Sequence, residues 1–319
     1  MSPAASASGA PGSVVATPAQ GRGPAPALVP VLDIGGTHVT AALVAPADAR
    51  VTARRRAPLD GRGTAEQILG AVADCARELA GSVDGGQPPP GAAWGVAIPG
   101  PFDYPRGVGR FRDVGKFDSL RGVDVGRALA AELPGAPGRV AFVNDAHAFL
   151  LGEWHAGAAR PHRRCVGITL GTGVGSAFLA DGAIATSGAG VPPEGRADLL
   201  TIDGRPLEET VSRRALLARY GDPTLDVRAV ADRARAGEER AGRVLGDAFT
   251  ALGRALAPWL TAFGATGLVV GGSMAGSWDL IGPALRAGLG PAAPMVTITT
   301  GERDSDAPLL GAARVAVGD

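Results

Sequence analysis

Three glycine-rich turns are the segments of this chain whose residue types could bind phosphate. They are Gly35-Gly36-Thr37, Gly171-Thr172-Gly173 and Gly271-Gly272-Ser273, and each follows an apolar run. Backbone N–H groups in such turns can converge on a phosphate because no Cβ blocks their approach, and the hydroxyls of Thr37 and Thr172 would add donors. One such turn alone is usually a simple hairpin, but three of them together favour a phosphate site.

A carboxylate stands directly before the first of these turns. Asp33 ends the apolar run Val29–Leu32, two residues before Gly35. It could hold a Mg²⁺ ion through water beside a bound phosphate, because Mg²⁺ keeps several waters and takes only one or two carboxylates. The sequence therefore predicts phosphate and magnesium at the same turn.

The elements that position these residues alternate between strands and helices. A strand, a glycine turn and a second strand over 29–44 return over 165–179, which is an internal repeat. A helix over 65–80 is predicted from Thr64 and Gln67, which form a capping-box pattern before apolar residues at helical spacing. Further strands are predicted over 94–98, 140–143, 268–272 and 295–299, and further helices over 207–220, 226–236, 238–263, 276–288 and 307–316. This order predicts an α/β protein of two lobes that face each other across a cleft.

Composition excludes several classes of protein. The 319 residues contain 31 basic and 31 acidic side chains, so the chain lacks the charge of a nucleic-acid binder. Cys75 and Cys165 lie 90 positions apart, which argues against a disulfide scaffold or a zinc ribbon and fits a reducing cytoplasm. Residues 1–28 are rich in Ala, Pro, Gly and Ser and are predicted to be a disordered tail. No apolar run is long enough to cross a membrane, so we expect a cytoplasmic location.

Five motifs, in this order and spacing, resemble the ROK (repressor, open reading frame, kinase) family of sugar kinases, which includes bacterial glucokinases. The similarity covers about 29–316. It implies the actin-like, ribonuclease-H-like pair of lobes, with ATP in the cleft and phosphorylation of the C6 hydroxyl of a hexose. The motifs are Asp33-Ile-Gly-Gly-Thr37, Ile98-Pro-Gly-Pro101, Asn144-Asp145-Ala146, Leu170-Gly-Thr-Gly-Val-Gly175 and Val270-Gly-Gly272.

The resemblance assigns roles to individual residues. Asp145 matches the general base, which would orient the sugar hydroxyl and accept its proton as it attacks the γ-phosphorus. Gly100 and Asn144 fall among the sugar contacts. Asp33, Gly35, Gly36, Thr37 and Gly171 to Gly173 would handle phosphates and Mg²⁺, while Gly271, Gly272 and Ser273 would face the adenosine. An alternative for Asn144 or Asp145 is that it only caps the following helix, and His147 and His155 on that helix are interpreted as packing or surface residues.

The chain departs from the family pattern in the segment that follows. Glu194 and Glu208 match the two sugar-binding glutamates, although a solvated loop acid and a first-turn helix acid are alternatives. Ala197 replaces the usual histidine, and the cysteine-rich zinc loop is missing. Because structural zinc needs about four Cys or His ligands, the sequence predicts a variant without structural zinc. Arg196 or Asp198 could then reach a different substituent of the sugar ring.

Several alternatives stay open at this level. The sugar could be glucose, mannose, glucosamine, an N-acetyl-hexosamine or kanosamine, and polyphosphate could replace ATP as donor. Some relatives are repressors, but the 28-residue tail is too short and too weakly charged for a DNA-binding domain, which leaves a sugar-sensing regulator as the non-enzyme alternative. We expect a small lobe over 29–143, to which the helix within 304–319 returns, and a large lobe over 144–303. The expected partners are a small sugar and a second copy of the chain, with neither nucleic acid nor a membrane.

Overall fold

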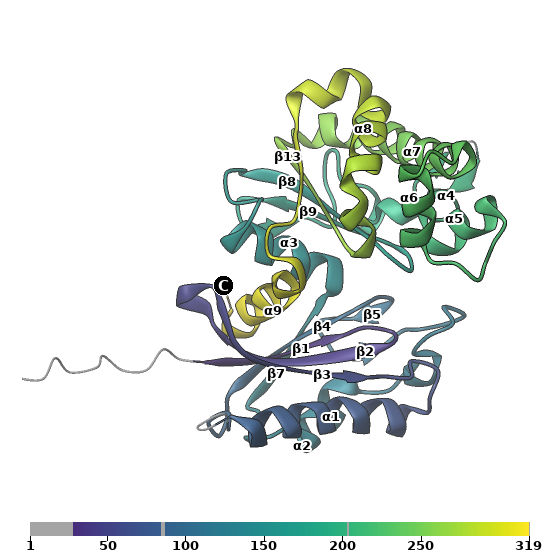
Figure 1. Cartoon of the computed structure of the whole chain (residues 1–319). Coiled ribbons are helices and arrows are strands. Elements are labelled where there is room, and N and C mark those ends of the chain that lie inside the picture. The colour runs from purple at the N-terminus through teal and green to yellow at the C-terminus, as the bar shows by residue number, and fades with distance from the viewer. Residues whose placement is uncertain (1–27, 84–86, 203, 319) are drawn as a thin grey trace, which may run out of the picture.

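The computed structural model describes residues 28–83, 87–202 and 204–318 and contains two five-stranded sheets (Figure 1). The predicted disordered tail, 1–28, lies outside the described residues except for Leu28. Each sheet has helices on both faces, and the two sheets form the bodies of two lobes. This is the two-lobed α/β fold that the repeat and the alternation of elements predict.

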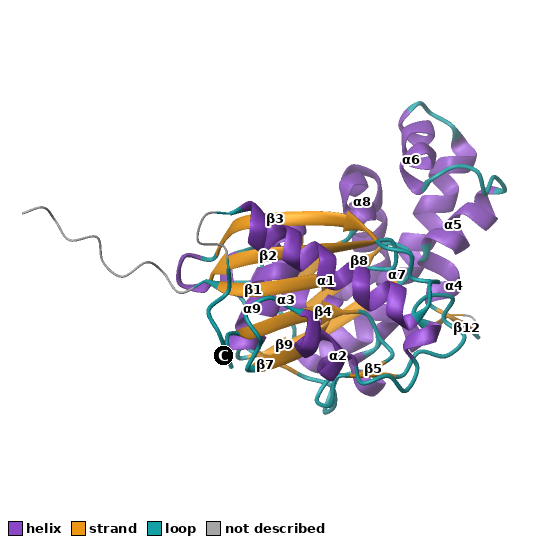
Figure 2. Cartoon of the chain, turned by 90° about the horizontal axis from the view of Figure 1, so that it is seen from below, coloured by secondary structure: helices purple, strands orange, loops and turns teal. Residues whose placement is uncertain are grey.

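The first sheet has the strand order β3-β2-β1-β4-β7. Strands β1, β4 and β7 are parallel, whereas β2 is antiparallel to both β1 and β3. Helices α1 and α2 cover one face of this sheet and α9 covers the other (Figure 2). The bounds are β1 Val29–Ile34, β2 His38–Ala45, β3 Arg50–Pro58, α1 Ala65–Ser82, β4 Ala93–Ile98, α2 Val125–Glu132, β7 Arg139–Asn144 and α9 Ala307–Val317.

The second sheet repeats this plan with the order β10-β9-β8-β13-β14. Strands β8 and β9 form the second antiparallel hairpin, and β13 is parallel to β8 and β14. Helix α3 packs on β8 and β9, and the long helix α7 packs along α8 in the core of this lobe. The bounds are α3 Asp145–Ala156, β8 Arg164–Leu170, β9 Val174–Ala180, β10 Ala183–Ile184, α4 Glu208–Val211, α5 Arg213–Tyr220, α6 Val227–Arg235, α7 Glu239–Phe263, β13 Gly267–Gly271, α8 Trp278–Leu289 and β14 Thr297–Thr300.

Helices α3 and α9 lie between the two sheets and pack closely on each other (Figure 1). The contact depends on two glycines, because a Cβ on Gly152 would collide with the carbonyl of Ala307 and one on Gly311 with the carbonyl of Ala148. Below this contact, the buried carboxylate of Glu153 accepts hydrogen bonds from the backbone N–H groups of Glu302 and Arg303 at 3.0 and 2.8 Å. The lobes are therefore joined through a tightly packed pair of helices.

Several predicted elements are confirmed, one is corrected and one strand was missed. Helix α1 has the predicted capping box, in which Thr64 accepts from the N–H of Gln67 while the Gln67 side chain accepts from the N–H of Thr64. The single helix predicted over 207–220 is wrong: Ser212 has an extended backbone and caps α5, which splits the segment into α4 and α5. Strand β3 was not predicted because it is a charged edge strand, in which Arg54, Arg55 and Arg56 hide the alternation of apolar residues.

Candidate active site

Two of the predicted acidic residues lie at one edge of the first sheet, where its parallel strands end. The register pairs Asp33 of β1 with Ala97 of β4, and Ile98 of β4 with Asn144 of β7. The carboxyl ends of neighbouring parallel strands open onto the same edge, which is the usual place for a ligand in α/β proteins. Asp33, the loop after β4 that holds Gly100, and Asp145 are thus brought to one place.

Asn144, and not Asp145, is the N-cap residue of α3. The Asn144 Oδ1 accepts hydrogen bonds from the N–H groups of Ala146 at 3.0 Å and His147 at 3.3 Å. Its amide nitrogen donates to the Tyr104 hydroxyl at 3.0 Å, which in turn donates to the carbonyl of Ile98 at 3.3 Å. The cap alternative therefore holds for Asn144, and the helix begins at Asp145 rather than at Ala146.

The carboxylates of Asp33 and Asp145 are close enough to influence each other. Burial and the neighbouring Asp145 charge raise the pKa of Asp33 to about 7. Burial also raises the pKa of Asp145, against the opposing charge of Lys116 and a hydrogen bond from the N–H of Ala146 at 2.9 Å. Two desolvated acids that resist ionising together are suited to proton transfer and to a cation, because a cation would relieve their repulsion. Oxygen ligands of this kind fit Mg²⁺.

The first glycine turn closes the hairpin of β1 and β2 and is covered by a lysine. The N–H of Gly35 donates to the carbonyl of His38 at 2.8 Å, and the exposed Thr37 hydroxyl is bonded to the His38 ring at 2.9 Å. A Cβ on Gly36 would lie 3.1 Å from Cδ of Lys116, so the lysine stem passes directly over the turn. Sequence reasoning missed Lys116, although it is the only lysine among 31 basic residues.

The second glycine turn closes the equivalent hairpin of β8 and β9. The N–H of Gly171 donates to the carbonyl of Gly173 at 3.1 Å, and the carbonyl of Gly171 accepts from the N–H of Arg213 at 3.1 Å. Strand β13 runs parallel to β8, and its end brings Ser273 beside the turn, where a Cβ on Gly171 would lie 3.8 Å from the Ser273 hydroxyl. The second and third glycine turns are thus brought together at one edge of the second sheet.

Gly271 and Gly272 serve packing within the lobe. A Cβ on Gly271 would lie 2.5 Å from the ring of Phe149, and one on Gly272, whose φ is +84°, would collide with the backbone of Leu170. The space that these glycines free is filled by neighbouring protein atoms. Their predicted contact with adenosine stays a prediction, whereas the residues that follow them line a pocket.

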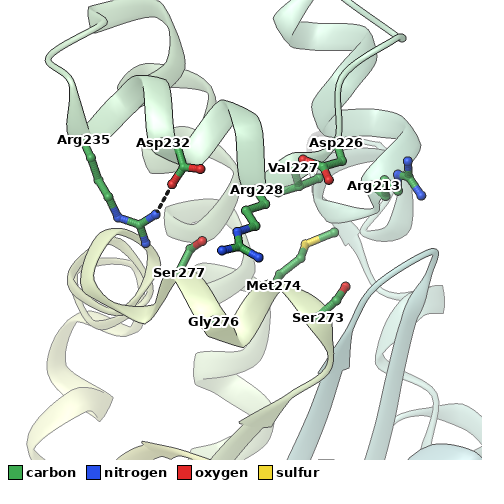
Figure 3. Close-up of a pocket in the computed structure, with 10 residues that line it drawn as sticks. All are labelled: Arg213, Asp226, Val227, Arg228, Asp232, Arg235, Ser273, Met274, Gly276 and Ser277. Atoms are coloured by element: carbon green, nitrogen blue, oxygen red, sulfur yellow. Dashed lines mark hydrogen bonds and ion pairs between the residues drawn. The ribbon is translucent and has the colours of Figure 1, made fainter.

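This pocket lies between α6 and the short helix Ser273–Ser277 and has a volume of about 640 Å³ (Figure 3). Its wall on α6 is partly charged, but Arg235 is already paired with Asp232 and with Asp279, both at 2.7 Å. The lining residues are Arg213, Asp226, Val227, Arg228, Asp232, Arg235, Ser273, Met274, Gly276 and Ser277. Two residues of the pocket, Ser273 and Arg213, also lie beside Gly171 of the second glycine turn. A ligand in the pocket could therefore extend toward that turn.

The segment predicted to contact the sugar forms a charged cluster around Arg196. Arg196 binds Asp198 through two hydrogen bonds, at 2.6 and 3.2 Å, and lies 3.8 Å from the carboxylate of Glu194. Glu194 is exposed and has a φ of +58°, which is uncommon for a residue with a side chain. Burial and the neighbouring Asp198 charge raise the pKa of Glu208, and a Cβ on Gly173 would lie 2.7 Å from its Oε1. Glu208 therefore links this cluster to the second glycine turn.

Ala197, at the position of the expected histidine, is buried beside this cluster. The Ser176 hydroxyl donates to the carbonyl of Gly195 at 2.7 Å and accepts from the N–H of Ala197 at 2.8 Å, which holds the loop to β9. Within 28–83, 87–202 and 204–318 no group of three or more His, Cys, Asp or Glu side chains could hold a metal ion. In the same described residues, no helix is long and apolar enough to cross a membrane.

The two histidines of α3 have the packing roles predicted for them. Burial lowers the pKa of His147 to about 4, so its ring is neutral at pH 7 and is not a base that exchanges protons there. The ring of His155 is bonded to the carbonyl of Pro46 at 3.1 Å and to Arg314 of α9 at 2.8 Å. Neither ring competes with Asp145 for the role of base.

Comparisons with known proteins identify the family and agree with the two-lobed fold. The model of the ROK family matches residues 30–318. The glucokinase of Thermotoga maritima is 27% identical over 281 residues, which are 80% of this chain and 84% of that protein. The ROK hexokinase of Thermus thermophilus superposes with a TM-score of 0.71 at 27% identity, over 91% of this chain and 98% of that one. A ROK glucokinase of Streptomyces griseus, solved with glucose and AMPPNP, superposes with a TM-score of 0.74 at 23% identity, over 92% of this chain and all of that one, and shows the same fold. The chain belongs to the ROK family.

Proposed function

We propose that this protein transfers the γ-phosphoryl group of ATP to the C6 hydroxyl of a hexose or amino-hexose. That the chain is a sugar kinase rests on its family and on its glucokinase and hexokinase relatives. The finer statement rests on one observation: the carboxylate of Asp145, at the start of α3 directly after β7, is near enough to Asp33 to raise the pKa of that acid.

Asp145 is the general base of the proposed reaction. Its raised pKa brings the carboxylate nearer to the range in which it can accept a proton from an alcohol. Phosphoryl transfer passes through a loose transition state, so positioning the hydroxyl in line with the γ-phosphorus matters more than strong basicity. The Asn144 cap and its bond to Tyr104 fix the backbone from which Asp145 projects.

Magnesium fits the acidic edge of the first sheet. Asp33 would hold the ion through water, with the phosphates of the donor completing its coordination. The bound ion would neutralise charge on the β- and γ-phosphates. Asp33 itself must be ionised for this purpose, and the cation would favour that state over the protonated one.

The donor is ATP, with a polyphosphate chain as the alternative. The pocket of about 640 Å³ beside Ser273 has the size of a small-molecule site, and it offers the Met274 side chain together with polar groups. Arg235 in this pocket is held by Asp232 and Asp279, while Arg213 and Arg228 also line it and are the cations that a polyphosphate chain would use. We place the adenosine in this pocket and the phosphates toward Gly171 to Gly173.

The sugar lies between Asp145 and the cluster around Arg196 in this proposal. Glu194 and Glu208 would accept hydrogen bonds from ring hydroxyls, and the Arg196–Asp198 pair would contact the part of the ring that a histidine contacts in relatives. Glucose is the default acceptor because the relatives of the chain include a glucokinase, although these contacts differ from the family pattern. Mannose, glucosamine, N-acetyl-hexosamines and kanosamine are the alternatives.

A panel of these sugars tests the proposal. Purified protein is incubated with each sugar and Mg-ATP, ADP release is followed in a coupled assay, and the phosphorylated carbon is identified by NMR. We expect one sugar to give a kcat/KM at least tenfold above the others and a 6-phosphate as product. Replacing ATP by polyphosphate separates the two donors. If none of the sugars in the panel causes release of ADP, or if the product is phosphorylated at another carbon, the proposed reaction is refuted.

A further inference from the structure

Lys116 has no role in the assignments above, yet its side chain lies at the centre of the candidate site. Its stem crosses the first glycine turn, since a Cβ on Gly36 would meet Cδ of Lys116 at 3.1 Å and one on Gly61 would meet its Cβ at 3.4 Å. The side chain is half-buried. A lysine can pack its aliphatic stem in this way while its ammonium stays accessible to water or a ligand.

The loop that carries Lys116 is held to the same turn by hydrogen bonds. The N–H of Gly61 donates to the carbonyl of Gly36 at 3.1 Å, and the N–H of Phe117 donates to the carbonyl of Gly61. Phe117 is fully buried with a φ of +61°, and the Asp118 carboxylate accepts the N–H of Gly115 at 3.3 Å. A buried aromatic residue in the left-handed region persists only when its surroundings hold it there, which is typical of functional sites.

The charges around the ammonium are those of the proposed reaction. Burial raises the pKa values of both Asp145 and Glu208, and the positive charge of Lys116 opposes this rise in each case. Asp145 is at the start of α3 and Glu208 at the start of α4, so the charge of Lys116 acts on acids of two separate elements. Within the described residues Lys116 has no ion-pair partner within 4 Å. Its charge is therefore available to a ligand.

The choice of lysine is itself informative. The other 30 basic residues of the chain are arginines. An ammonium is a compact charge on a flexible stem with three donors, whereas a guanidinium is a wider planar fork. The stem that packs against Gly36 and Gly61 therefore carries the more compact of the two cationic groups.

We propose that the ammonium of Lys116 binds the phosphoryl group that is transferred, on the side facing Asp145, and is a catalytic residue. It would neutralise charge on the oxygens of this group as the bond to the donor breaks and the bond to the sugar oxygen forms. This inference rests on the proposed function for the identity of the reaction, but the affinity of Lys116 for phosphoryl groups can be measured without any turnover.

The test compares Lys116→Met with Arg121→Met, which removes an exposed cation from the same loop. Inorganic tripolyphosphate with Mg²⁺ serves as the binding probe in calorimetry, and kcat and KM are measured with the best sugar. We expect Lys116→Met to bind tripolyphosphate about tenfold more weakly and to lose about 10²-fold in kcat, with the affinity for the sugar unchanged. Arg121→Met should match the wild type in all three measurements.

A restored charge separates a chemical role from a structural one. In Lys116→Cys the new thiolate displaces bromide from 2-bromoethylamine, which rebuilds a lysine-like ammonium, while Cys75 and Cys165 are buried and escape. We expect the alkylated variant to recover at least tenfold in kcat over the untreated one, and Lys116→Arg to stay at least tenfold below the wild type. If Lys116→Met keeps kcat within threefold of the wild type, or alkylation restores nothing, the proposal is wrong. If the wild type phosphorylates no sugar, the proposed function fails, and an equal affinity of Lys116→Met and wild type for tripolyphosphate would separately refute the role of Lys116.

Discussion

The turn after β1 and the turn after β8 occupy equivalent positions in the internal repeat, but different side chains surround them. Both close an antiparallel hairpin, and in both the N–H of the first glycine bonds a carbonyl within the turn or next to it. Before the first turn stands Asp33, whereas the same place in the second copy is occupied by Thr169. Lys116 packs on the first turn and Glu208 on the second.

This difference indicates how a duplicated scaffold divides one reaction. The first turn has an acid, a lysine and Asp145 within reach, which are the groups needed for a metal, a transferred phosphoryl group and a proton. The second turn has Ser273 and a pocket on one side and Glu208 on the other, which suit the holding of two substrates. In our account the chemistry therefore lies at the first turn, while the second positions donor and sugar.

The largest effect is expected at Asp145. The substitution Asp145→Asn keeps the size of the side chain and removes the base, so kcat should fall by about 10²–10⁴-fold while the KM values for sugar and ATP change little. Steady-state kinetics together with calorimetry of sugar binding would measure both. An unchanged kcat would remove Asp145 from the reaction and with it the special role of the first turn.

Adding a methyl group to each turn tests the division directly. In Gly36→Ala the new Cβ presses on the Lys116 stem at 3.1 Å, and in Gly173→Ala it presses on the Glu208 carboxylate at 2.7 Å. We expect Gly36→Ala to lower kcat by roughly tenfold, and Gly173→Ala to raise the KM for the sugar by about tenfold with a smaller change in kcat. Gly70→Ala in α1, where a Cβ meets nothing within 4 Å, is the control. The same kinetic change in both turn variants would contradict the division.

The sequence was sufficient to predict the features of each turn that depend on residues neighbouring it in the sequence. The two hairpins and their repeat followed from apolar runs that flank glycines, and the start of α1 from the capping box of Thr64 and Gln67. Asp33 was singled out by its place just before the first turn, and Asp145 by the resemblance to the ROK family. These features depend on local patterns that the chain shows directly.

The features that the sequence did not predict depend on contacts between distant segments. Lys116 packs on the first turn although it follows that turn by some 80 residues in the sequence. The only feature of the sequence that marked it was that the chain has no other lysine. Gly271 resembles a ligand-binding glycine in sequence, but its missing side chain makes room for Phe149 of α3. The break at Ser212 was hidden because the apolar spacing continues across it.

The acid of the first turn predicts how stability depends on pH. In the folded chain Asp33 has a pKa of about 7, against 3.8 for the usual value. Its contribution to the free energy of unfolding is therefore present below pH 3.8 and is lost as the pH rises through 7. Between pH 5 and pH 8 without Mg²⁺, the wild type should lose roughly 2–3 kcal/mol more stability than Asp33→Asn.

Thermal unfolding in a series of buffers would measure this difference. Added Mg²⁺ should raise the Tm of the wild type more at pH 8 than at pH 6, because only the ionised Asp33 holds the ion. It should have little effect on Asp33→Asn. Equal pH dependence of the wild type and Asp33→Asn would show that this acid is not strained by its neighbour.

The smallest effect is expected from treatment with a zinc chelator, because we expect the protein to hold no structural zinc. In the loop between Glu194 and Glu208, the Ser176 hydroxyl bonds the backbone of Gly195 and Ala197. Elemental analysis of the purified protein should find no stoichiometric zinc, and a strong chelator should stop turnover only until Mg²⁺ is added back. One tightly bound zinc per chain would mean that the loop around Ala197 has been misinterpreted.

Hydrogen exchange measured with each substrate in turn tests most directly whether the two turns act together. Saturating sugar alone should slow exchange in the segments around 95–103 and 190–210, because the sugar joins Asp145 to the cluster around Arg196 and draws the lobes together. A non-hydrolysable ATP analogue should then add protection around 171–176 and 271–276. If saturating sugar leaves the first two segments unprotected, or if the nucleotide alone protects all four to the same extent, the two turns do not divide the reaction as we propose.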